Sequence, residues 1–505
     1  MRLFSSDIYD IKALRKYLIF LTAFTALSYI TKGYVYVLLP FFVLAAAVRE
    51  KLVDLMFYVI LFCFAGIANP YIFPKTPFTF IVSRLSLFTV AGILMLRVAG
   101  RRSAKIVTPF KGIFLYVAWA ALVSVQGFDP IVSYLKIILF VPIYLALYGV
   151  ANEVTSSSRV NAKAVRSAVL SIVCMMVLGS ALLLPFPSIS QLQVLKTDDL
   201  ERVLAMMAQG HSLFMGITNH SQALGPMLGV LLSLVLGDLV FSVKRWDALY
   251  LSLLGIGFLL IVKSSSRTGM GTFVAGSAIV LWLFMRARAV AAGWKYKVLV
   301  SALIVAVVAV IAVLCIPSTR NRVLGFALKT NANAVTVTSS DVTFENVTST
   351  RQGLIDEAMR NFGNKPMLGN GFQVSEEMQH VKRNSLLEYM SAPIEKGVWP
   401  TAILEEGGIP GLVLFGGFLL VAMYLLIRRH AYIGAATLWA FIIVNLGEFN
   451  FFSMSYTGGF EWALVYAAVI LDGQRMKNVG LEIWDVPMEQ VFEEVGYDEW
   501  TRRRA

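Results

Sequence analysis

The chain has 505 residues, of which 57% are hydrophobic and only 15% are charged. A soluble protein of this length would not bury so much apolar surface, so the composition excludes that class and predicts a polytopic membrane protein. The net charge of +13 lies mainly in short loops between apolar segments, which indicates contact with membrane lipids and excludes a nucleic-acid partner.

Apolar segments long enough to cross ~30 Å of hydrocarbon as helices recur along the chain. We therefore expect an all-α polytopic membrane protein with about fourteen transmembrane helices. They fall near residues 17–31, 34–48, 53–69, 78–96, 108–126, 131–150, 167–186, 221–243, 246–262, 269–285, 298–316, 409–427, 432–447 and 456–472. No small-residue cleavage site follows the first segment, which is therefore predicted to stay in the mature protein.

Lysine and arginine cluster in alternate loops between these segments. Arg49 and Lys51 form one such cluster, and Arg428 and Arg429 form another. Because basic loops resist translocation across the membrane, we predict that these loops and both termini face the cytoplasm.

Two longer segments, about 187–220 and about 317–408, interrupt this spacing, and both fall on the predicted external side. The chain is therefore predicted to comprise five parts. They are N-terminal transmembrane helices (1–186), central helices with the first external loop (187–316), a large external loop (317–408), C-terminal helices (409–472) and a cytoplasmic tail (473–505).

The large external loop contains its own structural signals. Residues 333–347 have β-branched residues around a Ser-Ser-Asp turn, which predicts a hairpin. Residues 349–363 predict an amphipathic helix that begins at a capping box of Ser349 and Gln352 and stops at Gly363. The apolar stripe of that helix consists of Leu354, Ile355, Ala358, Met359 and Phe362. We expect a small folded lid.

Motifs for metal binding and for common nucleophiles do not occur. Cys63, Cys174 and Cys315 lie in or at the end of apolar segments, so a disulfide is not expected. The chain has neither a Gly-Lys-Ser/Thr phosphate loop nor a Gly-x-Ser-x-Gly nucleophile motif. We expect no metal and no cofactor.

Several ionisable residues lie inside or at the edge of the apolar segments, including Arg84, Lys136 and Glu461. Such charges are costly in a bilayer and usually mark a polar cavity or a substrate path. For Arg84 and Lys136, the alternative is that the side chain reaches the membrane surface. Arg267 lies in a tight turn of small residues, "KSSSRTGMG", where its guanidinium can bind a phosphate through two hydrogen bonds.

Two external histidines are candidate site residues. His220 precedes the predicted helix at 221–243, where free amides and the helix dipole favour an anion. Its alternative role is to cap that helix together with Asn219 or Ser221. His380 lies in the large external loop, where a solvent-exposed histidine is the alternative.

Four stretches together resemble the O-antigen ligase and O-antigen polymerase superfamily of bacterial inner-membrane glycan transferases. "SSRTGMGTFVAGSAIVLWLF" (265–284) is similar to the family's Ser-Arg-Thr/Gly opening of a span. "STRQGLIDEAMRNFGNKPMLGNGFQ" (349–373) is similar to its Arg-containing helix and Asn-x-Pro-Leu-x-Gly-x-Gly turn. "RNSLLEYM" (383–390) and "LEEGGIPGLVLFGGFLL" (404–420) resemble its entry into the next span. The resemblance covers roughly residues 200–430.

The resemblance implies a metal-independent glycosyltransferase in the bacterial inner membrane, acting in exopolysaccharide or lipopolysaccharide biosynthesis. The donor would be an oligosaccharide on undecaprenyl diphosphate, and the hydroxyl of an acceptor glycan or lipid would displace the lipid diphosphate at the outer face. By resemblance, Arg267, Arg351 and Arg383 would bind the diphosphate, which needs positive charge in a low-dielectric pocket. The further candidate ligands of the diphosphate are Lys396, His220 and Arg84.

The chain departs from the family pattern around the expected base. Family ligases have a histidine before Asn-Ser, whereas this chain has Arg383 there and His380 three residues earlier. The acceptor hydroxyl needs a base within hydrogen-bond reach, and the sequence leaves that role open between Glu395 and His380. Lys396 would then pair with phosphate, and the alternative for this stretch is a salt-bridged turn at the membrane surface. Glu405 and Glu406 are expected to interact favourably with the dipole of the following helix.

Two other classes of function stay open at this point. One is a lipid-linked oligosaccharide flippase or other transporter, which would place charges and broken helices near the bilayer midplane in both halves. The other is a noncatalytic envelope assembly factor, for which polysaccharide export machinery would be the partner.

Overall fold

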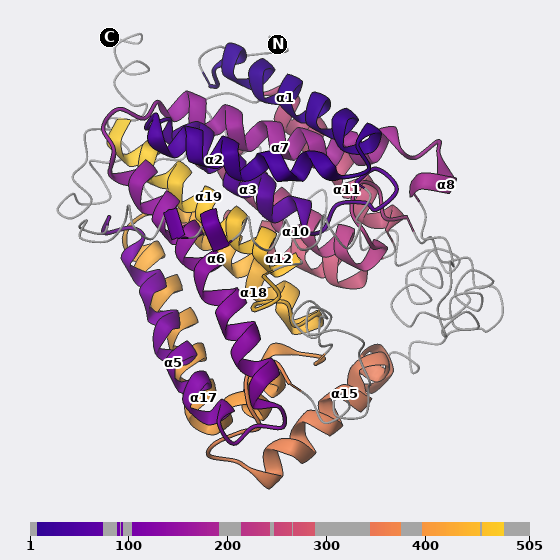
Figure 1. Ribbon diagram of the computed structural model, residues 1–505, viewed down its shortest axis with the longest axis vertical. Coiled ribbons are helices and arrows are strands. Elements are labelled where there is room, and N and C mark those ends of the chain that lie inside the picture. The colour runs from indigo at the N-terminus through magenta and orange to yellow at the C-terminus, as the bar shows by residue number, and fades with distance from the viewer. Residues whose placement is uncertain are drawn as a thin grey trace.

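The computed structural model describes residues 8–73, 88–90, 92–93, 104–190, 214–242, 247–264, 266–287, 344–374, 396–454 and 457–478 (Figure 1). These residues contain helices and no strand, apart from one isolated bridge between Ala68 and Thr218. The helices are α1 (Ile11–Ile30), α2 (Leu39–Val48), α3 (Leu52–Ala65), α5 (Ile113–Ser124), α6 (Pro130–Ser156), α7 (Ala162–Leu182), α8 (Pro187–Ser190), α10 (Ser221–Phe241), α11 (Ala248–Lys263), α12 (Arg267–Ala287), α15 (Phe344–Asn364), α17 (Trp399–Arg428), α18 (Tyr432–Gly447) and α19 (Thr457–Asn478), with 3-10 turns at Tyr34–Leu38 and Thr108–Gly112 before α2 and α5.

The predicted apolar segments coincide with helices wherever the structure describes them in full. Of the other segments, 298–316 lies outside the described residues, only a few residues of 78–96 are described, and 221–243, 246–262 and 456–472 each lack one terminal residue. Within the described ranges, six helices are long and apolar enough to cross a membrane. The chain is therefore an all-α membrane protein, and the total of about fourteen spans stays a prediction.

Four helices begin at polar residues whose side chains satisfy the free backbone amides of the first turn. Asp10, Asp129, Asn161 and Asp247 accept hydrogen bonds from backbone N–H groups at the starts of α1, α6, α7 and α11. Such caps fix where each helix starts, and each contributes about 1 kcal/mol.

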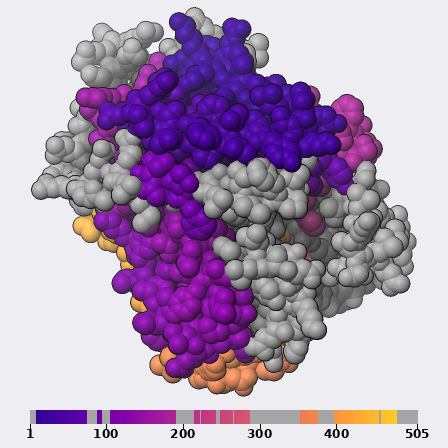
Figure 2. All heavy atoms as spheres, viewed as in Figure 1, coloured from indigo at the N-terminus to yellow at the C-terminus, as the bar shows by residue number. Residues whose placement is uncertain are grey.

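The helices form two differently oriented groups. Figure 1 shows α5, α6 and α17 side by side, running toward the end of the molecule that α15 covers. The indigo helices α1, α2 and α3, together with α7, form a layer across the other end of this group (Figures 1 and 2). Helix α19 packs against α18, α6, α10, α3 and α7, so it lies at the centre of the bundle.

One set of contacts joins loops that the sequence places on the cytoplasmic side. Arg166 donates to both carboxylate oxygens of Asp238, at 2.9 and 3.1 Å, and to the carbonyl of Ile8 at 2.8 Å. The Lys477 ammonium donates to the carbonyl of Ser157 at 2.9 Å.

A second set joins loops that the sequence places on the external side. The Asn69 amide donates to the carbonyls of Ile189 and Gly216, at 2.9 and 2.7 Å. The backbone N–H of Phe128 donates to the carbonyl of Asn370 at 2.8 Å. The contacts of each set thus join segments that the sequence predicts on the same side of the membrane.

The amphipathic helix predicted between residues 317 and 408 is confirmed, with different limits. Helix α15 begins at Phe344 and ends at Asn364, so Ser349 lies inside it and the predicted capping box is wrong. The Gln352 side chain instead donates to Asp356 at 2.8 Å. The last residues of the predicted hairpin, 344–347, are helical, and the rest of it lies outside the described residues. Ala358 is buried as expected.

The predicted apolar stripe of α15 needs one correction. Met359 is 41% exposed, whereas Asn361 is 2% exposed. A polar residue therefore belongs to the buried face of α15, because its side chain finds a partner there.

Candidate functional site

Helix α17 is broken near its start, and the break creates a docking site for another part of the chain. Gly408 has φ +64° and ψ −163°, a conformation that residues with a Cβ avoid. Pro410 has no N–H to donate to the carbonyl of Glu406, four residues earlier. Backbone groups around the break must therefore find partners outside the helix.

Those partners come from residues 365–374, which we call the docking segment. The carbonyls of Glu405 and Glu406 accept from the N–H groups of Asn370 and Gly371, at 2.7 and 3.1 Å. In return, the N–H of Ile409 donates to the carbonyl of Pro366 at 2.9 Å. The backbone groups released by the break are therefore paired with the docking segment.

Glycines allow the two backbones to approach this closely. A Cβ on Gly369 would lie 2.5 Å from the backbone of Glu406, and a Cβ on Gly408 would lie 2.6 Å from the carbonyl of Pro366. Gly369 and Gly371 also have positive φ angles, of +68° and +104°. Side chains at these positions would force the segments apart.

The docking segment is also anchored to the end of α5. The N–H of Phe372 donates to the Ser124 hydroxyl at 3.0 Å, and the Lys365 ammonium donates to the carbonyl of Gln126 at 2.8 Å. The Phe372 ring is fully buried, with its centroid 5.0 Å from that of Phe452 and 6.3 Å from that of Phe140. The segment thus joins α5, α6, α17 and the connection between α18 and α19.

A buried cluster of charges lies beneath this junction. The Lys396 Nζ is 3.0 Å from Glu405 Oε2 and 3.3 Å from Glu406 Oε1, and all three side chains are at most 3% exposed. The side-chain amide of Asn361 on α15 donates to Glu405 Oε1 at 2.9 Å. The Tyr116 hydroxyl on α5 donates to Glu406 Oε2 at 3.2 Å. We call these five residues the Lys396 cluster.

The charge state of Lys396 follows from its surroundings. Burial alone would lower the pKa of Lys396, because it disfavours the ammonium form. The two adjacent carboxylates outweigh burial and raise the pKa of Lys396 above its ordinary value. Lys396 is therefore a permanent cation that holds two carboxylates in the interior.

The structure gives Lys396, Glu405 and Glu406 contacts that the sequence did not reveal. Lys396 was predicted to pair with phosphate or to form a salt-bridged turn at the membrane surface; it forms ion pairs, but in the interior. Glu405 and Glu406 were predicted only to interact with a helix dipole, and their contacts with Asn361 and Tyr116 were missed. The signal that indicates such a break is "EEGGIPG", where two glycines and a proline follow paired carboxylates.

Arg267 and His220 lie at a second location. Arg267 begins α12 and is half-buried. His220 directly precedes α10, and its carbonyl accepts from the Thr218 hydroxyl at 3.0 Å. The first turns of these helices touch, since a Cβ on Gly269 would lie 2.4 Å from the carbonyl of Gly225. The structure thus brings two predicted diphosphate ligands to the same end of a helix pair.

The connection between α18 and α19 lies between the two locations. A Cβ on Gly447, at the end of α18, would lie 2.5 Å from the hydroxyl of Thr268, which follows Arg267. Further along, the Phe451 ring centroid is 6.4 Å from that of Trp399 at the start of α17. Residues 447–451 therefore contact both the α12 end and the α17 end of the candidate site, a role that sequence reasoning missed.

Four predicted site residues, Glu395, His380, Arg383 and Arg84, lie outside the described residues. Arg351 belongs to α15, of which only the backbone is described at that position. Lys136 and Glu461 are 4% and 0% exposed, so both side chains are buried within the protein. In the part of the chain that the structure describes, no group of three or more His, Cys, Asp or Glu side chains is placed to hold a metal ion.

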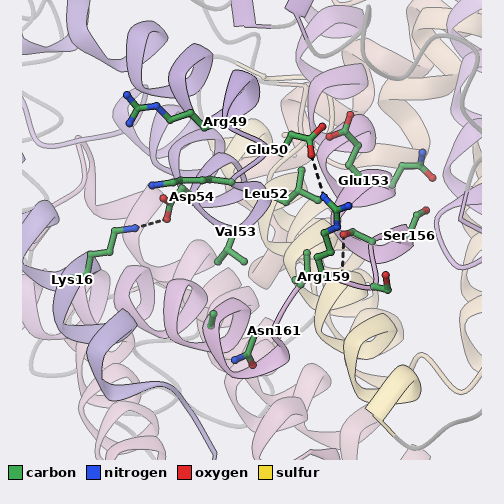
Figure 3. A pocket seen from close by; sticks show the side chains of 16 residues that line it. Lys16, Arg49, Glu50, Leu52, Val53, Asp54, Glu153, Ser156, Arg159 and Asn161 are labelled. Carbon is green, nitrogen blue, oxygen red and sulfur yellow. Dashed lines mark hydrogen bonds and ion pairs between the residues drawn. The ribbon is translucent and has the colours of Figure 1, made fainter.

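A pocket of about 860 Å³ lies among the loops of the predicted cytoplasmic side (Figure 3). Its wall contains Lys16 paired with Asp54 at 2.7 Å and Arg159 paired with Glu50 at 3.6 Å. Basic and acidic side chains are mixed along this wall, and the pocket holds none of the predicted site residues.

The full chain matches no model of a known protein family, and it matches no curated protein.

Proposed function

We propose that this protein transfers or polymerises a glycan carried on undecaprenyl diphosphate at the outer face of the bacterial inner membrane. The observation that carries the proposal is the contact between two stretches on which the family resemblance depends. Residues 365–371, from the Asn-x-Pro-Leu-x-Gly-x-Gly turn, exchange backbone hydrogen bonds with residues 405–409, from the Glu-Glu-Gly-Gly motif. Motifs that are far apart in sequence thus form one structural unit, as parts of a single site would.

The proposed transfer reaction needs a cation that stabilises the leaving diphosphate and a base that accepts the hydroxyl proton. The oxygen of the acceptor hydroxyl forms a bond to the anomeric carbon of the donor sugar, and the bond from that carbon to the diphosphate breaks. Arg267 stabilises the departing diphosphate, together with Arg351 and Arg383, and a base, Glu395 or His380, takes the hydroxyl proton. No metal is needed for these steps.

The Lys396 cluster has a positioning role in this proposal. Its ammonium faces two carboxylates, so a phosphate would have to displace them to bind Lys396 directly. Through Asn361 and the docking segment, the cluster instead fixes α15, which carries Arg351, against α17. Direct pairing of Lys396 with phosphate stays a prediction for a substrate-bound state.

A complementation experiment tests the proposal. The gene is deleted, and wild type, Arg267→Ala, Arg267→Lys or Arg360→Ala is supplied at equal abundance. We expect Arg267→Ala to accumulate lipid-linked glycan and to lose assembled polysaccharide, while Arg267→Lys retains part of the activity. Arg360 is an exposed arginine on α15, so its substitution is a matched control.

Polysaccharide length and lipid-linked intermediates are then compared on gels. Single repeats indicate lost polymerisation, and long chains left on the carrier indicate lost attachment. A wild-type profile from Arg267→Ala would overturn the assigned role of Arg267. Glycan trapped on the cytoplasmic leaflet would identify the protein as a flippase and contradict the proposal.

A further inference from the structure

Glu461 is a buried carboxyl group that the proposed transfer reaction does not use. It lies in the first turns of α19, the central helix, and is 0% exposed. Neither of its carboxylate oxygens has a hydrogen-bond partner in the described part of the chain. Asp472, on the same helix, is also fully buried, but it is paired with Arg475 at 3.2 Å and accepts from the N–H of Gly434 at 2.8 Å.

This difference determines the form in which Glu461 is stable. An ionised carboxylate without a partner is strongly disfavoured in an apolar interior, whereas the neutral acid is tolerated there. The side chains around this part of α19 are mostly apolar; Phe460 and Trp462, on either side of Glu461, are fully buried. No cation within the described residues offsets a negative charge at this position.

The charged groups on the neighbouring helices support the same conclusion. Lys16 forms an ion pair with Asp54 on α3, and Arg166 of α7 forms one with Asp238 on α10. Both cations are therefore paired with carboxylates other than Glu461. Lys136 on α6 does not act on Glu461. Glu448, at the end of α18, does act on it, and its negative charge opposes ionisation of Glu461.

We propose that Glu461 is an internal proton-binding site, occupied at neutral pH, which exchanges its proton with the external side of the molecule through Glu448. Glu448 is only half-buried, and it caps the end of α18 that leads to α19. Ionisable groups inside membrane proteins commonly serve as proton sites or relays. The ligand is thus the proton, and the inference does not rest on glycan transfer.

Infrared difference spectroscopy of the purified full-length protein tests this proposal. The spectrum of Glu461→Gln is subtracted from that of wild type at neutral pH, in light and in heavy water. We expect the loss of one protonated-carboxyl C=O band, which shifts in heavy water because its proton exchanges. Asp238→Asn is the control, because Asp238 is held by Arg166 and should lose carboxylate bands instead.

Stability measurements provide a second readout, since an amide closely replaces a neutral carboxylic acid. We expect Glu461→Gln to unfold at the same temperature as wild type, and Glu461→Asp to keep a protonated band at a shifted frequency. Loss of carboxylate bands in Glu461→Gln, or failure of this variant to fold, would overturn the proposal. Glu448→Gln should slow the exchange of the Glu461 proton in heavy water, and an unchanged rate would remove Glu448 from the route.

Discussion

Lys396 and Glu405 form an ion pair in the protein interior, with 3.0 Å between Nζ and Oε2. The pair joins the residues that precede α17 to the helix itself, close to the break at Gly408. Because Glu405 also accepts a hydrogen bond from Asn361, this pair links α17 to α15. The pairing therefore holds α15 in place against α17.

Removal of Lys396 should destabilise the fold strongly. Lys396→Met leaves two carboxylates buried next to each other, which typically costs about 3–5 kcal/mol in the free energy of unfolding. Neutralising the partners as well, in Lys396→Met with Glu405→Gln and Glu406→Gln, should restore much of that loss. Chemical unfolding in detergent of wild type, Lys396→Met, the Glu405→Gln and Glu406→Gln double variant and the triple variant measures this coupling, and strictly additive effects would contradict the cluster.

The contribution of Lys396 should be independent of pH over the neutral range. Its pKa is higher in the folded protein than in the unfolded chain, so the ammonium stabilises the fold at every pH below the unfolded value of about 10.4. That stability is lost only as the pH rises through the folded value. The difference in unfolding free energy between wild type and Lys396→Met should therefore persist from about pH 6 to about pH 9 and should not decrease as the pH rises. A difference that disappears by about pH 8 would mean that Lys396 is neutral when buried.

Gly408→Ala should release the docking segment from α17. An alanine there is strained by about 1–3 kcal/mol at this backbone conformation, and its Cβ would press on the carbonyl of Pro366. Hydrogen exchange of residues 365–374 should become faster, and that of α18 should not. Gly416→Ala on the same helix is the control, since a Cβ there meets nothing within 4 Å. Equal exchange in both variants would show that the break does not hold the segment.

Phe372→Ala should weaken the same junction from the apolar side. The ring is fully buried among Phe452, Phe140 and Tyr116, so its loss should cost about 3–5 kcal/mol. Met367→Ala, in the same segment, is the control because Met367 is 57% exposed. In thermal unfolding, Phe372→Ala should therefore unfold at a clearly lower temperature than Met367→Ala. A Phe372→Ala protein as stable as Met367→Ala would mean that the ring contributes little packing energy.

The sequence predicts the helices well because their signal is local. Long apolar runs set the positions of α6, α7, α10 and α18, and an apolar stripe predicts α15. The start of α15 was missed because Phe344 and Val347 continue the pattern of β-branched residues that precedes them, which favours a strand.

The candidate site depends on contacts between distant residues, which local patterns do not reveal. Asn361 and Glu405 are 44 positions apart, and Tyr116 and Glu406 are 290 apart. Glycine and proline indicate that the chain bends at 407–410, but they do not say which segment pairs with the exposed backbone groups. The sequence did identify Arg267 and His220 as site candidates, and packing of α10 on α12 places both at one end of that helix pair.

Reconstitution tests the central claim most directly. Purified protein in liposomes is supplied with a synthetic undecaprenyl-diphosphate oligosaccharide on the outward-facing leaflet, and the glycan products and free undecaprenyl diphosphate are measured over time. We predict that wild type joins the glycan to an acceptor or to a second repeat and releases one undecaprenyl diphosphate for each bond formed, whereas Arg267→Ala does not. Movement of the intact lipid-linked donor to the other leaflet, without any new glycosidic bond, would contradict the proposed transferase.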